Sequence, residues 1–189
     1  MVNEQLQNAA RAAHDVGIAT WFGGQVFGKF ALNPTVKVID DHATRGKVVN
    51  TGWFTFNPLG VAGLATASAV RIVARRTELH SARQTPAEQT LSQLEDGLLI
   101  TSVVLTALTG LQGARLAKQA PDGAVPIESG TEPAPETPEK AKGLQRSIGT
   151  LGNGSLLAGL GVISVRAVQD RLAYSRPPAR RGLVRLRGA

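Results

Sequence analysis

Two short clusters of histidine and aspartate have the residue types needed for metal binding or proton transfer. His14 is followed by Asp15, and His42 follows Asp40 and Asp41. Imidazole nitrogen and carboxylate oxygen both bind divalent ions, and a neighbouring His–Asp pair at the mouth of a membrane helix can relay protons. Adjacent residues rarely converge on one metal ion, however. We therefore interpret both clusters as charged surface groups and predict no metal site.

No other pattern in the chain indicates catalysis. The sequence contains no nucleophile paired with a base, no phosphate-binding loop and no zinc-protease helix. The absence of cysteine excludes Cys-ligated metal sites and a thiol nucleophile. Aromatic residues make up 4% of the chain, too few for a stacking platform, so we expect no nucleic-acid partner despite the net charge of +7. We predict that the protein is not an enzyme and has no cofactor.

The elements that would position these groups are long stretches without charge. Residues 48–70, 97–114 and 147–165 contain no Asp, Glu, Lys, Arg or His, and residues 16–28 form a shorter stretch that continues apolar past Lys29. About 20 helical residues cross the hydrocarbon layer of a membrane. Helices on the surface of a soluble bundle would show charges every third or fourth residue. The pattern predicts membrane-spanning helices.

We therefore predict an all-α fold, an integral membrane four-helix bundle. Its domain would cover residues 1–178, with spans at about 14–36, 50–72, 96–116 and 146–167. Residues 120–136, rich in Pro, Gly and acid, are expected to form a flexible, disordered loop. Residues 179–189 would be an Arg-rich tail.

Local signals mark some helix ends. Thr85, Pro86 and Glu88 have the spacing of a capping box and predict a helix start. Pro58, inside the second span, is expected to kink or interrupt its helix because it lacks a backbone donor.

Small residues are spaced for close approach of the spans, and a few polar residues lie within them. We predict helix packing at Gly24, Gly28, Gly60, Gly63, Gly154, Ser155 and Gly159. Packing within one chain is favoured over a homo-oligomer or a membrane-protein partner, which both remain open. The intramembrane polar residues would be Lys29, Asn57 and Asn153.

Basic residues suggest an orientation. The side that would hold both termini has more Lys and Arg near the spans, so we predict that both termini are cytoplasmic. The tail would then face anionic lipid headgroups, each basic residue adding about 1 kcal/mol of attraction. The residues predicted to make this contact are Arg176, Arg180, Arg181, Arg185 and Arg187.

The first span carries His14, then Trp21-Phe22-Gly23-Gly24, and then Pro34. This order resembles the opening of the copper-resistance-D-like membrane proteins and their relatives of unknown function. The resemblance covers about 20 residues. It implies a four-span bundle that handles copper or haem, with His14 as the one residue carried over. The single methionine and the lack of cysteine depart from that chemistry, because soft ligands suit Cu(I).

Taken together, these patterns predict a multi-pass protein of the plasma membrane of a prokaryote. Its role would be structural, accessory or in assembly, with the lipid bilayer as its main partner. One alternative is a small transporter-like or metal- or haem-binding module that uses His14, Asp15, Lys29 and Asn57. Another is a soluble helical protein that binds anionic partners.

Overall fold

The chain forms a bundle of long helices. The computed structural model describes residues 2–78, 85–120 and 124–174. Apart from one isolated bridge between Ile127 and Pro133, the regular structure in these ranges is helical. The elements are α1 (Val2–Phe27), the π-helical segment η1 (Gly28–Leu32), α2 (Asn33–Thr35), the 3-10 segment η2 (Val36–Val38), α3 (His42–Glu78), α4 (Pro86–Ala117) and α5 (Glu139–Tyr174).

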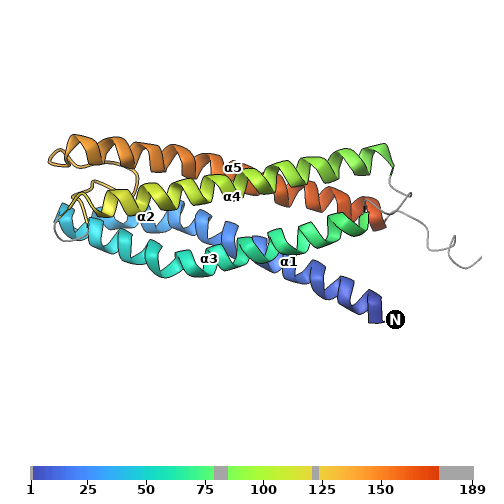
Figure 1. Cartoon of the computed structure of the whole chain (residues 1–189). Helices are drawn as coiled ribbons and strands as arrows, with labels where there is room; N and C mark the ends of the chain where they lie inside the picture. The colour runs from blue at the N-terminus through green and yellow to red at the C-terminus, as the bar shows by residue number, and fades with distance from the viewer. Residues whose placement is uncertain (1, 79–84, 121–123, 175–189) are drawn as a thin grey trace, which may run out of the picture.

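The four long helices lie side by side and alternate in direction (Figure 1). The start of α1, the end of α3, the start of α4 and the end of α5 share one end of the bundle, which we call the amino-terminal end. The short α2 and the connection between α4 and α5 lie at the other end, which we call the loop end. The most extensive contacts join α1 to α3 and α4 to α5.

Three of these helices are long and apolar enough to cross a membrane. They are α3 over His42–Arg76, α4 over Pro86–Ala117 and α5 over Glu139–Leu172. The first predicted span, in α1, is not among them. Its uncharged run begins only at Val16, and the α-helix gives way to the π-helical segment at Gly28.

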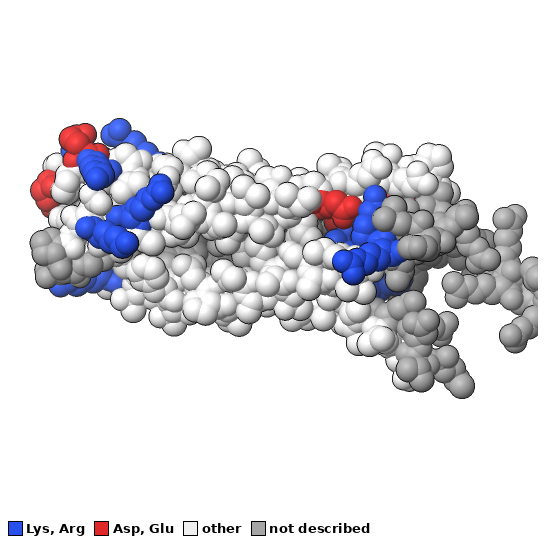
Figure 2. Space-filling view, viewed as in Figure 1, with Lys and Arg blue, Asp and Glu red and all other residues white. Residues whose placement is uncertain are grey.

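The bundle buries several polar side chains beside its apolar core and exposes large apolar side chains along its length. Helix α4 buries Ser92, Glu95, Leu99 and Ser102 on one stripe. Its opposite side exposes large apolar side chains at Ile100, Val103, Val104, Leu108 and Leu111. On the face drawn in Figure 2, Lys, Arg, Asp and Glu gather at the two ends, and the middle of the bundle is free of them. A helix packed in water would have the reverse arrangement.

Two apolar clusters lie inside the bundle. One, towards the amino-terminal end, centres on the fully buried Trp21 and Val162, with Ile18, Leu64, Ala67 and Leu99 around them. The other, at the loop end, consists of Val36, Val49, Val125, Ile127 and Ala141. These clusters hold in place the polar groups described below.

The structure corrects the prediction of a disordered loop at residues 120–136, and it tests the predictions made for Pro58 and for the capping box at Thr85. The part of the 120–136 loop that is described, from residue 124, is packed rather than flexible and disordered, since Val125 and Ile127 are buried. Helix α3 runs through Pro58 without interruption. The predicted capping box at Thr85 is confirmed, because its side chain and that of Glu88 each accept from the other's backbone amide.

Candidate functional site

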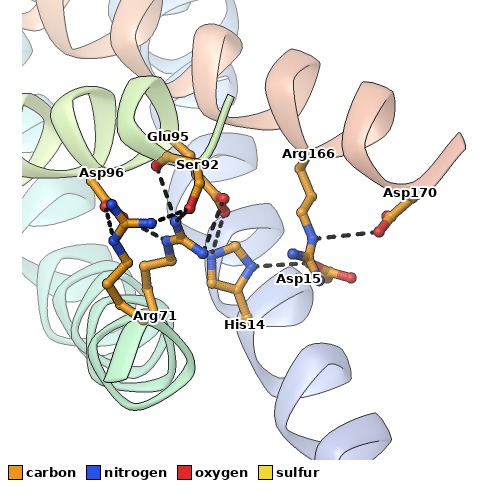
Figure 3. A network of polar contacts seen from close by, with 9 residues as sticks. His14, Asp15, Arg71, Ser92, Glu95, Asp96, Arg166 and Asp170 are labelled. Carbon is orange, nitrogen blue, oxygen red and sulfur yellow. Dashed lines mark hydrogen bonds and ion pairs between the residues drawn. The ribbon is translucent and has the colours of Figure 1, made fainter. Parts of the chain in front are cut away.

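All four long helices contribute to a network of polar side chains at the amino-terminal end (Figure 3). His14 comes from α1, Arg71 from α3, Glu95 from α4 and Arg166 from α5. His14, Arg71 and Glu95 are buried, Glu95 completely. Ionisable side chains are rarely buried without a partner, so their environment decides what they can do.

His14 lies between two carboxylates. Its Nδ1 is 3.0 Å from Oδ1 of Asp15, whose side chain is 49% exposed. Its Nε2 is 3.7 Å from Oε1 of Glu95, which is beyond hydrogen-bond distance. The sequence singled out the His14–Asp15 pair but gave no sign of Glu95 beside it.

Glu95 has the least satisfied carboxylate of the network. Both of its oxygens are buried and neither has a hydrogen-bond partner. The nearest cation is Arg71, with Nη1 3.5 Å from Oε2. Buried carboxylates are normally hydrogen-bonded or closely paired, so the two oxygens of Glu95 are an exception within this network.

The remaining contacts tie α3 to α4. Arg71 Nε is 2.6 Å from Asp96 Oδ1, and its Nη2 donates to the Ser92 hydroxyl at 2.6 Å. Arg75 makes the same two contacts from the next turn, at 3.1 Å to Asp96 Oδ2 and 2.8 Å to the Ser92 hydroxyl. Arginine is suited to such shared contacts because its guanidinium group offers five donors in a plane.

On the α5 side, Arg166 faces two carboxylates. Its Nε is 3.5 Å from Oδ1 of Asp15 and 3.8 Å from Oδ1 of Asp170. The network therefore extends from the half-exposed Asp15, through His14, to the buried Glu95 and the two arginines of α3.

A second set of polar contacts lies farther along the bundle. Lys29 in η1 donates to the side-chain oxygen of Asn153 in α5. The structure thus brings together two of the three residues predicted to be polar within the membrane. The third, Asn57, is half-buried on α3 and does not join this pair.

Several of the small residues singled out by the sequence face a neighbouring helix of this chain, whereas Gly60 faces Phe56 of its own helix α3. Gly17 of α1 and Gly63 of α3 meet backbone to backbone, since a Cβ added at Gly63 would lie 2.7 Å from the Gly17 carbonyl oxygen. Added Cβ atoms at the other predicted glycines would also meet neighbours: Gly24 and Gly60 meet the Phe56 ring, Gly28 meets Trp53, Gly154 meets Leu105 and Gly159 meets Trp21. Ser155 is buried, with its hydroxyl 3.5 Å from that of Thr106.

The second histidine cluster, at the loop end, does not converge. The His42 ring contacts acids of the loop instead: its Nδ1 is 2.6 Å from Oε1 of Glu136, and its Nε2 is 3.2 Å from Oε2 of Glu128. Asp41 accepts hydrogen bonds from the hydroxyl and amide of Thr44, which lower the pKa of its carboxyl. Asp40 is exposed.

Buried Arg45 fastens the loop of residues 124–138 to this end. Its guanidinium group donates to the carbonyl oxygens of Ile39 at 2.6 Å and Glu128 at 3.1 Å, and it pairs with the Glu128 carboxylate at 3.1 Å. Thr137 donates to the Pro126 carbonyl at 2.6 Å. The same loop also supplies Ser129, whose carbonyl accepts from the buried Gln145 at 3.1 Å.

Neither histidine cluster fits the metal chemistry that the resemblance implies. Within residues 2–78, 85–120 and 124–174, no group of three or more His, Cys, Asp or Glu side chains is placed to hold a metal ion. Both ring nitrogens of His14 face carboxylates, and the surrounding donors are oxygen and nitrogen. Copper(I) prefers sulfur, and haem needs a free axial imidazole.

Sequence reasoning missed Glu95, Arg71 and Ser92. Glu95 precedes the third predicted span and Arg71 is the penultimate residue of the second, so both resemble ordinary charges at the ends of spans. The sequence did contain a signal. Arg71 lies at the end of the predicted span 50–72 and Glu95 just before the predicted span 96–116, and a short connection joins these two ends. No family model, no curated protein and no solved structure matches the chain.

Proposed function

We propose that this chain is a four-span integral protein of the plasma membrane of a prokaryote, with both termini in the cytoplasm. The observation that carries the proposal is the reversed distribution of polarity. Glu95, Ser102 and Gln145 are fully buried, whereas apolar side chains such as Phe30, Leu59 and Ile100 are at least 60% exposed. Hydrocarbon as the solvent accounts for both halves of this pattern.

The first span is part of the proposal. Helix α1 runs along the bundle with the candidate spans (Figure 1), in contact with α3 and α5. Val16, Phe27 and Phe30 are each more than 60% exposed there. The one cation of this stretch, Lys29, pairs with Asn153 of α5. A paired polar group costs far less in hydrocarbon than an unpaired one, which supports a span at residues 14–36.

Within this membrane setting, the proposed role is non-enzymatic: a structural, accessory or assembly component. The close backbone contact of Gly17 with Gly63 and the buried ring of Trp21 support a bundle that packs as one unit. Arg176, Arg180, Arg181, Arg185 and Arg187 lie outside the described residues. We assign them to contact with anionic lipid headgroups, which attract basic side chains.

The orientation is proposed from the distribution of basic residues. The amino-terminal end carries Arg11, Arg71, Arg75, Arg76 and Arg166, and the tail adds more. Several cations of the loop end are paired with acids, as Lys37 is with Glu132 and Arg45 with Glu128. Retention of basic residues in the cytoplasm then favours a cytoplasmic amino-terminal end.

Labelling of single introduced cysteines tests both insertion and orientation, because the chain has no cysteine of its own. Asn8→Cys marks an exposed position at the amino-terminal end, and Glu139→Cys marks a side chain that is 86% exposed at the loop end. A membrane-impermeant maleimide added to intact spheroplasts should label Glu139→Cys and leave Asn8→Cys unlabelled until the cells are lysed. The cysteine-free parent chain is the control.

Two results would contradict this proposal. The opposite labelling pattern would reverse the orientation. Equal labelling of both cysteines only after lysis, together with release of the chain from membranes by carbonate, would remove the membrane assignment.

A further inference from the structure

The His14 imidazole connects a carboxylate in contact with solvent to one sealed inside the bundle. Its Nδ1 is 3.0 Å from the half-exposed Asp15, and its Nε2 is 3.7 Å from the completely buried Glu95. An imidazole with an acid at each nitrogen is the arrangement that moves protons, because one nitrogen can take up a proton while the other gives one away.

The buried side of this contact lacks a hydrogen bond. His14 Nε2 and both oxygens of Glu95 are buried and have no hydrogen-bond partner. A proton held between them, on Nε2 or on the carboxylate, makes one group the donor and the other the acceptor. A small rotation of the Glu95 side chain would then shorten the 3.7 Å between His14 Nε2 and Glu95 Oε1 to hydrogen-bond distance. One proton would satisfy two of these orphaned atoms at once.

Several charged groups lie around the pair. Arg71 of α3 contacts Glu95 itself, Arg75 of α3 contacts Asp96, and Arg166 of α5 contacts Asp15. The carboxylates are Asp15, Glu95, Asp96 and Asp170. Arg11 of α1 and Arg76 of α3 are exposed at the same end.

We propose that His14 relays protons between water at the amino-terminal end and Glu95, which is a proton-binding site inside the bundle. A proton from water, guided by Asp15, adds to Nδ1 of neutral His14 and forms imidazolium. The Nε2 proton then passes to the Glu95 carboxylate, which becomes a carboxylic acid, and the ring returns to the neutral state with its proton on Nδ1. Release follows the same steps in reverse. This inference goes beyond the proposed function and does not depend on the orientation of the chain.

Infrared difference spectroscopy tests the binding site. Purified protein in detergent is compared in acidic and alkaline buffers, and a protonated Glu95 gives the C=O stretch of a buried carboxylic acid. We expect Glu95→Gln to remove that band. Glu139→Gln, which changes an exposed carboxylate at the loop end, should leave it. If the Glu95→Gln spectrum equals that of the parent chain at every pH, Glu95 binds no proton and the proposal fails.

The rate of hydrogen–deuterium exchange tests the relay. Transfer into D₂O shifts the Glu95 band, and the shift can be followed after rapid mixing. Asp15→Asn and His14→Gln should slow it by at least ~10-fold, the scale of loss expected for a positioned proton donor. Asp170→Asn is the matched control, because Asp170 contacts Arg166 as Asp15 does but does not touch His14.

The two relay variants protect the test against misfolding. His14 is buried, so His14→Gln is first checked by circular dichroism and gel filtration. Asp15 is half-exposed, and Asp15→Asn carries the test alone if His14→Gln does not fold. Exchange in Asp15→Asn at the rate of the parent chain would overturn the relay, even if Glu95 binds a proton.

Discussion

The contact of Gly17 with Gly63 allows a sharp test of how closely α1 and α3 pack. A Cβ added at Gly63 would lie 2.7 Å from the Gly17 carbonyl oxygen, where ordinary contact begins at 3.4 Å. The shortfall is about 0.7 Å. Because the atom it meets belongs to the backbone of another helix, no side chain can rotate away. Gly63→Ala must push the two helices apart.

The expected cost can be separated from helix propensity by a matched control. Overpacking of this kind costs about 1–3 kcal/mol, whereas replacing glycine by alanine in a helix contributes about 0.5–1 kcal/mol of stability. Gly23, on α1, has no heavy atom within 4 Å of an added Cβ. Gly23→Ala therefore has the propensity gain without the clash. The difference in unfolding free energy between the two variants should be about 1–3 kcal/mol.

Unfolding in mixed detergent micelles, followed by tryptophan fluorescence, measures this difference. Trp21 is completely buried in the same cluster as Leu64 and Ala67, so it reports on the α1–α3 contact. We expect Gly63→Ala to unfold at lower denaturant than the parent chain, and Gly23→Ala at equal or higher denaturant. Equal midpoints for the two variants would refute the close approach of the helices.

Three further predictions concern other parts of the chain. The hydrogen bond to Lys37 lowers the pKa of Glu132, and the same bond raises the pKa of Lys37. The pair should therefore stabilise the loop end at neutral pH. This stabilisation should be lost as pH falls through the lowered Glu132 pKa, and also as pH rises through the raised Lys37 pKa. When proteolysis of the loop is measured against pH, Lys37→Met should remove this pH dependence. Lys29→Met leaves Asn153 without its donor and should cost about 1–3 kcal/mol, whereas adding Asn153→Leu should recover most of the loss in the same denaturation assay. With the protein held in neutral-lipid nanodiscs, deletion of residues 179–189 should weaken binding of added anionic vesicles by about 1 kcal/mol for each arginine removed, and leave binding of neutral vesicles unchanged.

The sequence alone predicts much of the helical framework, because long stretches without charges follow simple rules. A stretch without charges, as long as the membrane is thick, has few structures open to it other than a helix. The capping box at Thr85 has a purely local cause and was predicted for the same reason. The small residues at Gly24 and Gly63 were singled out by spacing alone, but which helix each one touches depends on the tertiary fold.

The loop of residues 120–136 shows where composition misleads. Proline, glycine and acidic residues predict an extended chain on average. The described part of the loop nevertheless packs, because two apolar side chains, Val125 and Ile127, enter a cluster and Arg45 binds a loop carbonyl. A few well-placed contacts to a preformed bundle are enough to order a segment that has no core of its own.

The network at the amino-terminal end was beyond sequence reasoning for a different reason. Glu95 is one residue before a predicted span and reads as a surface charge. Its burial follows from the stripe of Ser92, Glu95, Leu99 and Ser102 facing the other helices. That stripe becomes recognisable only when the outer face of α4 is known to be the apolar one. The partner, His14, belongs to the far end of the sequence, and no local pattern connects the two.

Stability alone does not account for the His14–Glu95 pair. Replacing a buried ionic pair with apolar residues of similar volume is often neutral or stabilising, since it avoids the cost of removing charges from water. The neighbouring cluster of Trp21, Leu64, Leu99 and Val162 holds the helices together without any charge. Our proposal accounts for a carboxylate that is buried and free of hydrogen bonds by the proton it can accept.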